Sequence, residues 1–295
     1  MTDYSDIQAV AERLLGANLR TKSIGEISAA LNELMSSHRR VNVELSDNMI
    51  WFRARTCQNS KPFDNLSEVL YHKVGSPDIG RANNKGARVL YASWNIATAL
   101  DEIGANQGDI VQLALVRPRR GVPAKFLSVG DLKNFHHTGR PLNRLPQLTD
   151  DLKQLKSADL HTFLRAVLVD AILSELFRTP GNQLRDYRIT SAFAHLAYSL
   201  GCGVIYPSVE VHNSLNFAIE APAFNAACEV VETCYLEVTS VAGYGLFEYQ
   251  VLNRTCAFGL DGEIDWSVRS LRKIPGSPEA GSYEDEYIPG WRVEA

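Results

Sequence analysis

The sequence predicts an α+β fold in which helices flank a split, strongly bent β core. The first observation is a set of short apolar segments bounded by turn residues, a pattern typical of strands. These segments lie near residues 48–54, 88–92, 109–117, 203–207 and 214–219. The second observation is that no GxGxxG motif follows a strand, so we do not expect a doubly wound dinucleotide-binding sheet. P-loop, HExxH and GxSxG motifs are also absent from the sequence.

Three parts of the chain are expected. They are a helical N-terminal extension (residues 1–45), a main domain (residues 46–265) and a C-terminal tail (residues 266–295). A polar segment with several prolines, at about residues 118–157, indicates an insertion of loop and short helix in the main domain. Its adjacent His136 and His137 would point in different directions on any regular element, so we interpret them as surface residues.

The composition favours an ordinary globular protein. Of the 295 residues, 45% are hydrophobic and 22% are charged, which allows a sizeable core. A net charge of −4 is unlike the excess of positive charge that is typical of nucleic-acid-binding proteins. No apolar run approaches the ~20 residues that a membrane span needs. The acidic N-terminus is unlike a secretory signal, and five cysteines without a CxxC pair indicate neither a disulfide framework nor a zinc site. We therefore expect a reduced, cytoplasmic location without direct contact to nucleic acid or membrane.

Two amphipathic helices are predicted in the extension, over residues 5–16 and 23–38. Ser23, with Glu26 three positions later, matches a capping box, and Leu31 lies on the apolar face of the second helix. We interpret the pair as a small helical addition to the main domain. A partner-binding arm is the alternative.

Two arginines share one face of the strand expected at residues 48–55. Arg53 and Arg55 lie on the same side as Trp51, whereas Phe52 points to the other side. Arginines in this position either face solvent or point into a pocket for an anion.

Residues 80–102 hold the densest set of reactive residue types. A glycine-rich turn with Arg81 precedes a strand with Tyr91, and the helix that follows ends near Glu102. The turn can hold phosphate, the tyrosine offers a stacking surface, and the carboxylate can act as an acid or a base. The same residue types also fit an exposed loop, a core tyrosine and a solvated carboxylate.

Another polar residue follows a buried strand later in the chain. The strand at residues 203–207 ends at Pro207, which places Ser208 just beyond it. Side chains at strand ends meet ligands in open sheets, although a Pro-Ser pair is also an ordinary turn. Further elements are expected as helices at residues 158–178 and 186–200 and as a hairpin at residues 228–240 and 244–258.

Four segments, in this order, resemble the RES domain family. They are WFRAR at residues 51–55, GRANNKGARVLYASWNIATALDE at 80–102, DYRITSAFAHLAYSLGCGVIYPS at 186–208, and SLNFAI at 214–219. The family is named for an arginine, a glutamate and a serine, which fall on Arg53, Glu102 and Ser208. A second arginine and a tyrosine that are common in its pocket match Arg81 and Tyr91. The resemblance covers about residues 48–220.

The resemblance implies a fold like that of the ADP-ribosyltransferases and an enzyme that cleaves the nicotinamide–ribose bond of NAD. RES proteins are typically toxins of bacterial toxin–antitoxin pairs, so it also implies an Xre-like helix-turn-helix antitoxin as the protein partner. NAD would be a substrate, with no prosthetic group and no metal required. Assembly of the chain into a homo-oligomer stays open.

The chain departs from the family pattern in several places. It is longer than a compact RES toxin, and it adds the N-terminal helices, the insertion, the C-terminal hairpin and the tail. These differences leave the antitoxin, the regulation and the acceptor open. Ser214 is a second candidate for the family serine.

The chemistry of NAD cleavage gives the matched residues their expected roles. Breaking the N-glycosidic bond builds positive charge on the ribose, which the Glu102 carboxylate would stabilise while holding the ribose hydroxyls. Arg53 and Arg81 would bind the pyrophosphate as planar forks. Tyr91 would stack on nicotinamide, and Ser208 would hydrogen-bond to nicotinamide or its ribose.

The acceptor distinguishes the remaining functional hypotheses. Water gives an NAD glycohydrolase, phosphate gives an NAD phosphorylase, and a protein side chain gives an ADP-ribosyltransferase. A module that kept the fold without the activity is a further alternative. Suitable residue types at all five matched positions argue against that last alternative.

Overall fold

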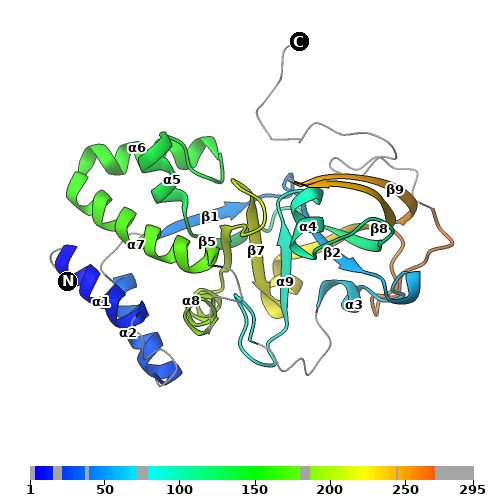
Figure 1. The fold of residues 1–295 in the computed structure, drawn as a ribbon, viewed down its shortest axis with the longest axis horizontal. Helices are drawn as coiled ribbons and strands as arrows, with labels where there is room; N and C mark the ends of the chain where they lie inside the picture. Colours follow the sequence, from blue (N-terminus) through cyan, green and yellow to red (C-terminus); the bar gives the residue numbers. More distant parts are fainter. Residues whose placement is uncertain are drawn as a thin grey trace, which may run out of the picture.

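The chain folds around one large sheet with helices on both faces, which confirms the predicted α+β class (Figure 1). The computed structural model describes residues 4–15, 22–36, 40–71, 79–179, 187–243 and 245–269. Its strands are β1 (Val41–Leu45), β2 (Trp51–Thr56), β3 (Val89–Ser93), β4 (Ile110–Pro118), β5 (Ala124–Ser128), β6 (Gly203–Pro207), β7 (Leu215–Glu220), β8 (Cys228–Gly243) and β9 (Leu246–Thr255). Their order in the sheet is β1-β5-β6-β7-β3-β2-β4-β8-β9. Among these strands only β5 and β6 pair in parallel, so the sheet is not doubly wound.

The helices divide between the two faces of the sheet. They are α1 (Tyr4–Leu15), α2 (Ile24–Ser36), α3 (Leu66–Leu70), α4 (Ile96–Glu102), α5 (Asp131–Thr138), α6 (Pro146–Ala158), α7 (Leu160–Arg178), α8 (Arg188–Ser199) and α9 (Ala221–Ala227). Strand β6 shows the division, because Ile205 packs in the cluster that contains α5 and α6, whereas Val204 and Tyr206 pack with α1, α2 and α8. In the described part of the chain, no helix has both the length and the apolar character that a bilayer span requires.

The sheet is split between β2 and β3. Strand β2 pairs with β4 along its whole length, from Trp51 to Thr56, but it pairs with β3 only at Phe52 and Ser93. One half of the sheet therefore contains β1, β5, β6, β7 and β3, and the other half contains β2, β4, β8 and β9. The predicted split of the β core lies at this junction.

Register shifts bend the second half of the sheet. One shift lies between Leu115 and Val116 in β4, and three more interrupt the pairing of β8 with β9. Such bulges bend a strand and increase its twist. The bulged strands and α4 bury a core of their own, in which Leu100 contacts the cluster around Phe52 and Leu113.

The two N-terminal helices form as predicted and share the core of the main domain. Ser23 and Glu26 make the expected capping box, since the backbone N–H of Ser23 donates to the Glu26 carboxylate (2.7 Å) and the N–H of Glu26 donates to Ser23 Oγ (3.2 Å). Leu31 is fully buried in one cluster with Val169 of α7 and Phe193 of α8. The helices are therefore packed onto the main domain through apolar contacts.

The prediction that residues 1–45 are helical is wrong at its end, because Val41–Leu45 forms strand β1. Its side chains alternate between buried and exposed, and it pairs along its length with β5. Strand β5 lies within residues 118–157, which were expected to be loop and short helix. That expectation was incomplete, since the segment supplies a strand of the sheet together with α5 and α6. Each of these two five-residue strands is stabilised by its pairing with the other.

The adjacent His136 and His137 are exposed on α5, as expected for surface histidines. The division of the chain into three parts stays a prediction. Residues 270–295 of the expected tail lie outside the described residues.

Candidate active site

Glu102 lies at the end of a short helix that is anchored on the second half of the sheet. Helix α4 begins where the Asn95 side chain accepts a hydrogen bond from the backbone N–H of Thr98 (2.7 Å). Its Leu100 is buried against β2 and β4. Thr98 and Glu102 are one helical turn apart, so both side chains face the segment that joins β6 to β7.

The Glu102 carboxylate is held by two donors from the first half of the sheet. Its Oε1 accepts hydrogen bonds from Ser208 Oγ (2.6 Å) and Asn216 Nδ2 (2.6 Å). The Glu102 residue nevertheless remains exposed. The carboxylate is thus fixed in direction and still accessible to a ligand.

Ser208 sits in a tight loop at the end of β6. Its hydroxyl donates to Glu102 and accepts from the backbone N–H of Val211 (3.0 Å), while its own N–H donates to the carbonyl of Ser214 (2.9 Å). The Ser214 hydroxyl instead bonds to Thr98 (2.6 Å) and is buried. Of the two candidates for the family serine, Ser208 is therefore the one in contact with Glu102.

Asn216 is a site residue that the sequence analysis did not single out. It stands in register with Tyr206 on β6 and Ser93 on β3. The buried Ser93 hydroxyl donates to Asn216 Oδ1 (2.8 Å), which turns the amide nitrogen toward Glu102. The available signal was one polar residue inside an apolar strand, since a buried amide must find partners.

Arg53 reaches across the split in the sheet. The β2–β3 register would place Ala54 opposite Tyr91, but that backbone pair is missing from the described strands. Instead Arg53 Nη1 donates to the Tyr91 carbonyl (3.3 Å) and Nε donates to the Val69 carbonyl (3.3 Å). Burial, with Arg55 nearby, lowers the pKa of Arg53 to about 10, so the guanidinium stays charged at neutral pH.

Arg81 and Tyr91 organise the glycine-rich turn. The Tyr91 hydroxyl donates to Asn83 Oδ1 (2.6 Å) and accepts from the backbone N–H of Ala82 (2.9 Å). Arg81 Nη1 donates to the carbonyls of Phe177 and Thr179 (2.9 Å to Thr179), at the end of α7. The turn is thereby tied both to β3 and to α7.

Four of the five predicted residues lie near one buried tyrosine. Tyr206 is 3% exposed, and its ring contacts Phe177 with the centroids 4.8 Å apart. Burial raises its pKa well above the ordinary value, and the nearby Tyr91 and Glu102 add to that rise, whereas Arg81 and Arg53 oppose it. Ser208 follows two positions later on the same chain segment. The predicted residues therefore gather at the junction of the two half-sheets.

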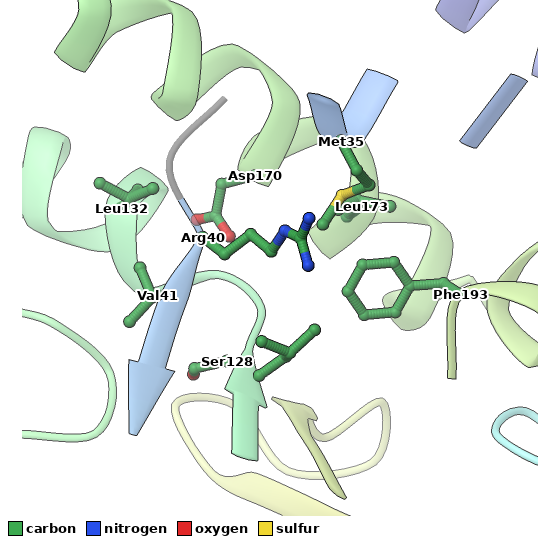
Figure 2. Close-up of a pocket in the computed structure, with 9 residues that line it drawn as sticks. Met35, Arg40, Val41, Ser128, Leu132, Asp170, Leu173 and Phe193 are labelled. Carbon is green, nitrogen blue, oxygen red and sulfur yellow. The ribbon is translucent and has the colours of Figure 1, made fainter. Parts of the chain in front are cut away.

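A small pocket elsewhere in the molecule contains none of the five predicted residues (Figure 2). It is lined by Arg40 and Asp170, among other side chains. The buried Asp170 carboxylate accepts from the backbone N–H groups of Gly130 (2.7 Å) and Lys133 (2.9 Å) at the start of α5. Burial raises the pKa of Asp170 to about 7. We assign this carboxylate to holding α5 against α7.

Comparison with known proteins identifies the part of the chain that builds the candidate site. A family model described as the RES domain matches residues 50–239, more than half of the chain. No curated protein and no solved structure matches the sequence. The matched range contains all five predicted residues as well as Tyr206 and Asn216.

Proposed function

Because the chain belongs to the RES domain family, we propose that it consumes NAD by cleaving the bond between nicotinamide and ribose. The observation that carries the proposal is the Glu102 carboxylate, which is exposed and is oriented by Ser208 and Asn216 at the junction of the half-sheets. A fixed negative charge that needs no reorganisation is what a developing positive charge on the ribose requires.

Glu102 acts on the ribose in this proposal. The bond to nicotinamide lengthens, its electron pair leaves with the nicotinamide ring nitrogen, and the ribose becomes an oxocarbenium ion. Nicotinamide departs as a neutral molecule and needs no proton from the enzyme. Both hydrogen bonds that the described residues make to the Glu102 carboxylate go to Oε1, which leaves Oε2 for the ribose hydroxyls or for the charge on the ring.

Arg53 and Arg81 bind the pyrophosphate. Each uses part of its guanidinium to hold the protein together, since the hydrogen bonds of Arg81 in the described residues involve only Nη1 and those of Arg53 involve Nε and Nη1. The remaining N–H groups can make bidentate contacts with phosphate oxygens.

Tyr91 and Ser208 position the nicotinamide end. The hydroxyl of Tyr91 is engaged by the turn, so its half-buried ring is the part that contributes to binding, by stacking on nicotinamide. Ser208 hydrogen-bonds to nicotinamide or its ribose and also steers Glu102. NAD is a substrate here, and the reaction requires neither a metal nor a prosthetic group.

The biological role that fits this activity is that of the toxin in a bacterial toxin–antitoxin pair in the cytoplasm, neutralised by an Xre-like antitoxin. Depletion of NAD would account for toxicity. Binding of the antitoxin and assembly with a second copy of the chain belong to the same proposal.

Product analysis tests the proposed function. Purified protein is incubated with NAD, and the products are separated and identified by mass. Release of nicotinamide in step with loss of NAD is the expected result; ADP-ribose identifies water as the acceptor, and ADP-ribose 1-phosphate identifies phosphate. Label that passes from NAD to a protein would instead identify an ADP-ribosyltransferase. Intact NAD after prolonged incubation with folded protein would contradict the proposal.

A further inference from the structure

Two basic side chains meet at the edge of the candidate active site. Arg178 is the last residue of α7, and His212 lies in the loop that begins at Ser208. Arg178 Nη2 is 3.3 Å from His212 Nδ1. A guanidinium can only donate, so Nδ1 accepts in this hydrogen bond and the ring proton lies on Nε2. Among the residues that the structure describes, no other group accepts from the remaining N–H groups of Arg178 or from the N–H of His212, so these donors are available to a ligand.

Both partners are held by residues of the candidate site. On one side, the carbonyls of Phe177 and Thr179, which flank Arg178, accept hydrogen bonds from Arg81. On the other side, Ser208 closes the loop of His212 by accepting from the backbone N–H of Val211 (3.0 Å). Arg178 and His212 are thus both held next to the candidate active site, Arg178 through the contacts of Arg81 and His212 through the loop that Ser208 closes.

The arginines of this region have no ion-pair partner among the residues that the structure describes. Within the described residues, neither Arg178 nor Arg53 nor Arg81 forms an ion pair with a carboxylate. The surface arginines Arg117 and Arg119, in contrast, share Glu229. Arginines gathered without acidic partners, in a chain with a net charge of −4, favour an anionic ligand.

We propose that Arg178 and His212 bind a phosphate group at the edge of the active site, in addition to the contacts expected from Arg53 and Arg81. This inference rests on the proposed function, and it adds two residues that neither the sequence motifs nor the family match single out. A planar guanidinium and an imidazole N–H can both donate hydrogen bonds to the oxygens of a phosphate group. Arg81 Nη1 already donates to the carbonyls at the end of α7, so further donors are needed to hold a phosphate group. The phosphate comes either from the pyrophosphate of NAD or from inorganic phosphate acting as the acceptor.

The test compares Arg178→Gln and His212→Gln with Arg140→Gln and His137→Gln, which change the same residue types at exposed positions on the α5 side of the molecule. Calorimetry measures the Kd of NAD and of ADP-ribose for each variant, and steady-state kinetics measures KM and kcat. We expect Arg178→Gln to weaken both ligands by on the order of tenfold, as for a lost charge-assisted hydrogen bond, with kcat nearly unchanged. The His212→Gln variant weakens them less, and the control variants match the wild type.

Inorganic phosphate separates the two sources. Weaker NAD binding at every phosphate concentration assigns the pair to the pyrophosphate. Unchanged NAD binding with a higher phosphate requirement for turnover assigns it to the acceptor. Identical NAD binding and phosphate dependence in wild type, Arg178→Gln and His212→Gln would overturn the inference while leaving the proposed function intact. A wild-type protein that neither binds nor cleaves NAD would instead overturn the proposed function itself.

Discussion

Ser208 Oγ lies 2.6 Å from Glu102 Oε1, although 106 positions separate the two residues in the chain. Glu102 belongs to a helix packed on β2 and β4, whereas Ser208 directly follows β6 in the other half of the sheet. Their hydrogen bond therefore crosses the split between β2 and β3. The position of Glu102 therefore depends on how the two half-sheets meet.

Replacing Asn216 should impair both activity and stability. In Asn216→Ala, Glu102 loses one of its two donors, and the buried Ser93 hydroxyl loses its acceptor. A buried polar group left without a partner costs about 1–3 kcal/mol. We expect urea unfolding to show a loss in this range and turnover of NAD to fall by roughly tenfold, about the value of one hydrogen bond to a charged group. Asn225→Ala, on the exposed face of α9, is the control. A folded Asn216→Ala protein with wild-type turnover would show that Asn216 does not orient Glu102.

Replacing Arg81 should weaken NAD binding more than it slows the chemical step. Arg81→Ala removes a guanidinium that ties the glycine-rich turn to the end of α7 and that is expected to contact pyrophosphate. Titration calorimetry should give a Kd for NAD raised by at least roughly tenfold. Arg81→Lys keeps the charge but not the planar fork, so it should restore only part of the affinity. Equal affinity in all three proteins would rule out a contact between Arg81 and the dinucleotide.

The N-terminal helices should contribute to global stability. Leu31 of α2 is fully buried against α7 and α8, and Leu31→Ala should lower the free energy of unfolding by about 2–5 kcal/mol. Ile24 on the same helix is 50% exposed, so Ile24→Ala serves as the matched control and should have a small effect. Both are measured by urea denaturation. Equal and small losses would mean that α1 and α2 unfold independently of the main domain.

The buried Asp170 should make stability depend on pH. Burial raises its pKa to about 7, whereas an aspartate in the unfolded chain titrates near 3.9. Between these values the folded protein keeps a proton that the unfolded chain has released. The contribution of Asp170 to stability is therefore complete below about pH 4, falls as the pH rises, and levels off above about pH 7.

Asp170→Asn isolates this contribution. The variant cannot titrate at this position, so its stability should decline less than that of the wild type between about pH 4 and about pH 7. Urea denaturation at several pH values provides the comparison. Parallel pH profiles for the two proteins would show that Asp170 has an ordinary pKa.

The sequence predicted those elements whose signal is local. The capping box of Ser23 and Glu26 and the strand that carries Tyr91 were found where expected, because spacing and alternation identify such features within a few residues. Strands β1 and β5 were missed although β1 alternates strictly. Each has only five residues, and the two strands pair with each other although the paired residues lie 79 (Leu45 and Ala124) to 87 (Val41 and Ser128) positions apart in the chain.

The pairing of β1 with β5 is not a local feature. Val41 of β1 pairs with Ser128 of β5, and no local sequence pattern indicates such a pairing. The site shows the same limit. Arg53, Glu102 and Ser208 were found through a family resemblance, whereas Asn216 and Tyr206 gain their places only from the order β6-β7-β3. Neighbours across a sheet are decided by topology, which a single sequence does not reveal.

The Glu102→Gln variant tests the central claim most directly. Glutamine keeps an oxygen that can accept from Ser208 and Asn216, but it removes the negative charge. Turnover of NAD is measured by nicotinamide release, the Kd of NAD by calorimetry, and the fold by circular dichroism. We predict a fall in kcat on the order of 10²–10³, with a much smaller change in Kd, because the positive charge on the ribose develops only in the transition state. A folded Glu102→Gln protein that releases nicotinamide at the wild-type rate would contradict the account.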